Sequence, residues 1–169
     1  GNAITDADWN VNIRDNLLET APAKATTAGG YFVATGANSI SQRTIFTDFI
    51  ATAQTTSTAS FIDLATAAPI VSNVPTGTHA LVLFKANVSH TVSNAVSAIS
   101  FTVSGATTLA SSFDYSAQAD GIFTAGNKPS ICGFKYVTLS AGNNTFKMQY
   151  YTGAATATFE LRELVVIPF

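Results

Sequence analysis

The side chains that could do chemistry are few in this chain and stand far apart. The 169 residues include two histidines, His79 and His90, and a single cysteine, Cys132. The histidines lie at opposite ends of one predicted strand, roughly 35 Å apart at the rise of an extended chain. That separation excludes a shared metal or catalytic centre within one chain. We expect both histidines to be surface residues at the strand ends.

The acidic residues form no pair suited to acid–base catalysis. Asp114 and Asp120 flank a loop that could hold a cation, but their spacing matches no calcium-binding loop. Glu160 and Arg162 predict an ion pair on one strand face, of little energetic weight. Cys132 lies in an apolar run and is predicted to be a buried packing residue. With no nucleophile elbow, phosphate loop or zinc-ligand spacing, the sequence indicates a protein that is not an enzyme and needs no cofactor or metal.

Four aromatic residues lie near predicted loops or strand ends. One interpretation is a sugar-binding platform, since a ring face stacks well on a pyranose. The other, which we favour, is packing in the core and at subunit interfaces, where aromatic residues dominate in any case. The four residues are Tyr115, Phe123, Tyr150 and Tyr151.

The composition favours self-association over binding to nucleic acid or membrane. Charged residues make up 11% of the chain, against about a quarter in an average protein. The net charge is −2, and the eight basic residues are spread thinly, so a phosphate-binding surface is not expected. No apolar run is long enough to span a bilayer. A nearly neutral surface repels other chains poorly, which favours stable assembly.

The first 44 residues differ from the rest. Thr5 is a suitable N-cap, and the spacing of Trp9, Ile13 and Leu17 predicts an amphipathic helix over roughly residues 6–20. Pro22 ends it. A helix this short needs a docking surface, either on the chain's own β domain or on another subunit or particle. Residues 21–44 predict an extended arm with isolated anchors, at Tyr31, Phe32, Val33 and Ile40.

From residue 45 to 169 the pattern is that of β-strands. Residues 97–104 alternate cleanly between apolar and polar, and so do residues 146–151. Turn residues separate about eight such runs, which predicts an all-β, antiparallel sandwich, and we expect a jelly roll. The other expected strands cover residues 46–53, 61–64, 79–90, 109–116, 131–139 and 159–167.

Two of these strands are apolar on both faces, which indicates that one face packs against another subunit. We expect the chain to form a homotrimer through such faces. The predicted interface residues are Leu81, Val82, Leu164 and Val166.

Particular blocks of sequence resemble virion structural proteins of tailed bacteriophages. The N-terminal blocks are Trp9–Leu17 (WNVNIRDNL), Glu19–Gly29 (ETAPAKATTAG) and Ala34–Asn38 (ATGAN). The body is similar to their β-sandwich modules at Phe61–Leu64, Ser100–Thr108, Leu139–Phe146 and Val165–Pro168. The similarity touches most of the chain but includes no catalytic signature.

The resemblance implies a structural role in the virion, assembled in the host cytoplasm. One form is a capsid decoration (cement) protein that trimerises and clamps the major capsid protein with its N-terminal arm. The alternative is a tail-fibre or tail-tip module, whose arm enters a tail or baseplate protein and whose β domain touches host-surface glycans. The absence of a shaft repeat favours decoration. A cellular lectin or cytokine-like ligand is disfavoured because the first residues do not read as a secretory signal.

Overall fold

A computed structural model describes residue 5 and residues 24–120, 125–153 and 155–169. It divides into two compact units between Thr44 and Ile45. The predicted helix, with Trp9, Ile13 and Leu17, lies outside the described residues. No helix among the described residues has the length and apolar character to cross a membrane.

The described part of the first unit is a β-hairpin rather than an extended arm. Strand β1 (Tyr31–Gly36) pairs with β2 (Ser39–Arg43) in antiparallel register, with Asn38 at a positive φ of 56° in the turn. Gln42 holds the preceding segment: its Oε1 accepts from the backbone N–H of Thr26 at 2.6 Å, and its Nε2 donates to the Thr27 carbonyl at 2.5 Å. The sequence did not predict this hairpin, because its many small polar residues mask the alternation between inward and outward side chains.

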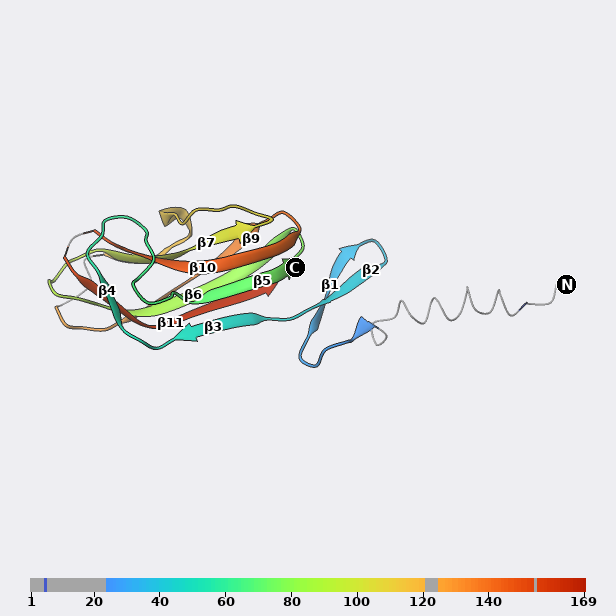
Figure 1. The fold of residues 1–169 in the computed structure, drawn as a ribbon, viewed down its shortest axis with the longest axis horizontal. Coiled ribbons are helices and arrows are strands. Elements are labelled where there is room, and N and C mark those ends of the chain that lie inside the picture. The colour runs from blue at the N-terminus through green and yellow to red at the C-terminus, as the bar shows by residue number, and fades with distance from the viewer. Residues whose placement is uncertain (1–4, 6–23, 121–124, 154) are drawn as a thin grey trace. The chain divides into compact units, whose positions relative to one another are not determined.

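The second unit is an antiparallel sandwich of two sheets, as predicted (Figure 1). One sheet has the order β3-β11-β6-β9, with β4 also paired to β11, and the other has the order β5-β10-β7-β8. The strands are β3 (Phe46–Ile50), β4 (Gln54–Thr56), β5 (Ile70–Thr76), β6 (His79–His90), β7 (Ser97–Gly105), β8 (Ala117–Ala119), β9 (Ser130–Thr138), β10 (Gly142–Thr152) and β11 (Ala157–Pro168).

The pairings are nested in the manner of a jelly roll. β7 pairs with β8, β6 with β9, β5 with β10 and β3 with β11, so a long hairpin is folded over itself. Residues 109–116, expected to be a strand, instead contain one bridge at Leu109 and a short 3-10 helix, Phe113–Tyr115. Ser112 caps that helix by accepting from the backbone N–H of Asp114.

The core lies between the sheets and follows the predicted alternation in most strands. Phe101 and Met148 are fully buried, and Phe84 packs on Phe101 with ring centroids 5.5 Å apart. Gly133 gives this ring its space, because a Cβ there would lie 2.8 Å from ring carbons of Phe84. The other large inward side chains are Val82, Val88, Ile99, Val103, Phe146, Tyr150, Phe159, Leu164 and Val166.

A β-bulge in β11 breaks the alternation that the sequence predicts for residues 159–167. The register against β6 shifts between Glu160 and Glu163, and Leu161 has a positive φ of 48°. Phe159 and Arg162 consequently both point into the core, while Leu161 is exposed. Phe159 therefore points to the opposite side of the sheet from Val165 and Ile167, although uninterrupted alternation would put all three on one face.

The bulge buries Arg162 completely, so the predicted surface ion pair with Glu160 is also wrong. Arg162 Nη2 donates to the Thr52 carbonyl at 3.0 Å, and its guanidinium lies 5.5 Å from the ring centre of Tyr150. Burial raises the pKa of the Tyr150 phenol, and the neighbouring Arg162 opposes that shift only in part. Glu160 instead pairs with Lys128 at 3.0 Å.

We predict that Arg162→Met and Arg162→Ala differ in their effect on stability. Met fills a similar volume without a buried charge, so we expect a free energy of unfolding within about 1 kcal/mol of wild type, or above it. Ala leaves a cavity and should lower the free energy of unfolding by about 3 kcal/mol. Urea denaturation measures both values. Equal losses for the two variants would show instead that the charge is what stabilises the site.

Candidate functional site

The strongest candidate for a functional surface is the outward face of the β3-β11-β6-β9 sheet. Because side chains alternate along a strand, the residues between the buried ones point away from the core. On β6, β9 and β11 many of these outward residues are also apolar. We call this surface the aromatic face, and its residues are Phe49, Leu81, Leu83, Phe134, Tyr136, Val165 and Ile167.

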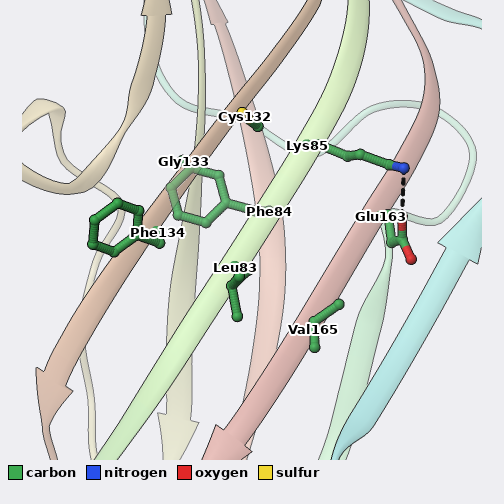
Figure 2. A pocket seen from close by; sticks show the side chains of 8 residues that line it. All are labelled: Leu83, Phe84, Lys85, Cys132, Gly133, Phe134, Glu163 and Val165. Carbon is green, nitrogen blue, oxygen red and sulfur yellow. Dashed lines mark ion pairs between the residues drawn. The ribbon is translucent and has the colours of Figure 1, made fainter.

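Strand pairing places these side chains in rows across the sheet. Leu83 is opposite Phe134 on one side and opposite Val165 on the other. In the next row Lys85 is opposite Cys132 and Glu163. Figure 2 shows these two rows around a shallow pocket of about 420 Å³.

The exposure of the aromatic face is large for a single chain. Phe134 is 75% exposed, Tyr136 56% and Phe49 52%. At about 200 Å² per aromatic side chain, these three leave roughly 350 Å² of ring in water. A contiguous apolar patch on a monomeric protein rarely exceeds a few hundred Å², and Leu81, Leu83, Val165 and Ile167 add further apolar area between these rings. The face therefore has the character of an interface.

The charges on this face cancel. Lys85 Nζ lies 2.8 Å from Glu163 Oε2, and the two side chains meet across neighbouring strands (Figure 2). At one end of the face, His79 stacks on Tyr136 with ring centroids 5.0 Å apart, and Tyr136 contacts Phe169 at 5.8 Å. A surface that is apolar and electrically balanced can meet its own copy without like-charge repulsion.

The predicted interface residues divide between the two faces of this sheet. Val82, Leu164 and Val166 are fully buried inside the chain, so they cannot contact a partner. Of the four, only Leu81 points outward. The sequence correctly indicated strands that are apolar on both faces, but assigned the wrong residues to the outer one.

Two other predictions about single residues change, and one holds. Cys132 is exposed on the aromatic face, so the prediction of a buried thiol is wrong. His90 is buried, contrary to the surface prediction, and burial lowers its pKa. Tyr150 is a core residue, as the packing interpretation has it, whereas Tyr115 is half-buried and packs on Phe101 at 5.3 Å.

The remaining candidate sites gain no support from the structure. Asp114 and Asp120 are both exposed, and the described residues contain no group of three or more potential metal ligands. Phe123 lies outside the described residues. Of the anchors expected in the first unit, Phe32 is 39% exposed and Tyr31 is half-buried in the hairpin.

Comparisons with known proteins identify the fold. No protein-family model matches the sequence, and no curated protein matches it. Among solved structures, the infectious bursal disease virus VP2 subviral particle matches with a TM-score of 0.51 and 11% identity over 80% of this chain. The T=1 particles derived from that virus match with a TM-score of 0.52 and 10% identity, also over 80%.

This likeness is one of fold. The chain spans about a third of the length of these capsid proteins, 37% and 35% respectively. At this level of identity the match establishes a shared jelly-roll architecture.

We predict that a maleimide reagent labels Cys132 in the native protein, because the thiol is exposed. Labelling should slow as protein concentration rises, since self-association would cover the aromatic face. Mass spectrometry over time measures the rate. Cys132→Ser should change the free energy of unfolding by less than about 0.5 kcal/mol. Labelling only after denaturation would contradict the exposed position.

Proposed function

We propose that this protein is a non-enzymatic structural component of a virion, which assembles with further copies of itself through the aromatic face. The observation that carries the proposal is the exposed, charge-balanced apolar surface built around Leu83, Phe134 and Val165. A neutral surface of this kind suits a permanent partner of the same composition better than a charged ligand.

The resemblance to tailed-bacteriophage virion proteins supports a more specific proposal. We propose a homotrimer that decorates the capsid, with residues 1–44 as the attachment device to the major capsid protein. Several arguments support this: a low charge content of 11%, a jelly-roll fold shared with viral particle proteins, and a separate N-terminal unit. A tail-fibre position is the alternative, and imaging of particles distinguishes head from tail.

The three exposed rings of the aromatic face supply almost half of the area that a stable interface needs. A stable complex buries about 800 Å² per partner. The three exposed rings alone supply roughly 350 Å² of it, and the aliphatic residues of the aromatic face with its polar margin, including Thr47 and Thr138, surround them.

We expect light scattering to give a mass three times the 17.6 kDa of one chain. Phe134→Glu places an unpaired charge at the centre of the aromatic face and should weaken self-association by at least about tenfold. Val92→Glu is the matched control, because Val92 is 46% exposed in the loop after β6 and outside the face. A wild-type mass of one chain at every concentration, or equal effects of the two variants, would rule out this interface.

We further predict that a chain beginning at Ile45 keeps its sheets and oligomeric state but loses attachment to the particle. The described core residues all lie within residues 45–169, so circular dichroism of the truncated chain should still show a folded β-sheet protein. Trp9→Ala in the full chain should weaken attachment in the same direction, as loss of an aromatic anchor does. Normal occupancy of the truncated chain on particles would contradict the attachment role. An unfolded truncated chain would show that residues 1–44 stabilise the β domain.

A further inference from the structure

A second surface, on the opposite sheet, combines aromatic and polar side chains. It runs along β10, whose outward residues Lys147, Gln149 and Tyr151 are half-buried. The segment around Ile62 pairs with β10, because the backbones of Ile62 and Tyr150 exchange two hydrogen bonds of 3.0 Å. Residues opposite each other in an antiparallel pair point to the same side. Phe61 therefore lies beside Tyr151.

By the same pairing Asp63 lies beside Gln149, and both point outward. Gln149 Nε2 donates to Asp63 Oδ1 at 3.2 Å, and Lys147 Nζ binds Asp63 Oδ2. Burial raises the pKa of the Asp63 carboxyl, but the hydrogen bonds from Lys147 and Gln149 and the Lys147 charge outweigh it, so the pKa lies below its usual value. The carboxylate is therefore charged at neutral pH and held in a fixed position.

The other margin of this surface is formed by the loop before β8. The hydroxyl of Ser100, on the outward face of β7, lies 3.2 Å from the carbonyl oxygens of both Ser112 and Tyr115 and accepts from the Ser112 backbone N–H at 3.4 Å, which fixes the loop against the sheet. Ser111 Oγ then donates to Gln149 Oε1 at 2.6 Å. Both ends of the Gln149 amide are thus held by neighbours.

Three rings close one end of the surface. Phe113 packs on Tyr151 edge to face at 4.8 Å and on Phe61 at 5.0 Å, and Phe61 contacts Tyr151 at 5.6 Å. Phe113 is nevertheless 45% exposed. Its neighbours fix the orientation of the ring while much of it stays in water. We call Phe61, Asp63, Phe113, Lys147, Gln149 and Tyr151 the mixed strip.

We propose that the mixed strip binds a neutral oligosaccharide, with a sugar ring stacked on Phe113 and its hydroxyl groups bound by Asp63 and Gln149. A sugar presents an apolar ring face for an aromatic side chain, and hydroxyls that donate and accept at once. The strip offers an acceptor in Asp63, donors in Lys147 and both kinds of group in Gln149. The charges of Lys147 and Asp63 balance, so a charged ligand has no advantage.

A peptide strand fits this surface less well. An extended peptide binds by adding to a free sheet edge, whereas β10 lies between β5 and β7 and its backbone is already paired. The site is independent of the proposed assembly, which uses the outward face of the other sheet.

Saturation-transfer NMR on the full chain tests the site, with lactose, maltotriose, chitotriose and mannotriose as saccharide probes and capped tetra-alanine as the peptide probe. We expect at least one saccharide to receive transfer and tetra-alanine to receive none. Phe113→Ala should raise the dissociation constant of that saccharide by at least about tenfold. Asp63→Asn, which preserves shape and should fold normally, should raise it several-fold through the lost charge-assisted hydrogen bond.

Val92→Ala is the matched control, since Val92 is about as exposed as Phe113, at 46%, and lies in the loop after β6, outside both surfaces. It should leave saccharide binding unchanged. The proposal is overturned if none of the four saccharides binds, or if binding survives both Phe113→Ala and Asp63→Asn. Transfer to tetra-alanine that both variants abolish would assign the strip to peptides and also overturn it. None of these outcomes depends on whether the protein forms trimers.

Discussion

A β-sheet has two faces, and a sandwich of two sheets covers only the inner face of each. In the β3-β11-β6-β9 sheet the inward face is covered by the second sheet, where Val82, Leu164 and Val166 are fully buried. The outward face carries equally apolar residues such as Leu83 and Phe134, which no described segment of the second unit covers. This imbalance underlies the assembly that we propose. The charged pairs on that face, Lys85 with Glu163 and Glu160 with Lys128, are each neutralised by their partner.

Much of the architecture could be predicted from the sequence because alternation follows directly from strand geometry. The strand at residues 79–90 and the jelly-roll class were evident, and alternation at residues 97–104 and 146–151 predicted most of β7 and the second half of β10. The prediction fails where alternation is broken. At Leu161 a positive φ inserts a bulge that turns Arg162 inward, and no pattern of residue types announces such a shift. The hairpin at residues 31–43 was missed because its small polar residues carry no alternating signal.

The candidate surfaces depend on tertiary relations that a sequence does not contain. In β9 the apolar run suggests that Cys132 is inside, yet Gly133 occupies the inward position and the Phe84 ring fills its space. Which face of β6 and β11 is the inner one was equally undetermined, so three interface residues were assigned to the wrong side. Asp63 and Gln149 are 86 residues apart in the chain and meet only through strand pairing. Their partnership could not be inferred from local spacing.

The nested strand pairing also determines the stage of folding at which the aromatic face is complete. The β7–β8 pair closes a short loop, whereas Arg162 and Thr52 meet across 110 residues, and widely separated contacts form slowly. The aromatic face draws residues from β3, β6, β9 and β11, so it is complete only after this slowest closure. A partly folded chain has no such surface to offer. In the assembly that we propose, only a completely folded chain presents this surface, so misfolded copies would be excluded from it.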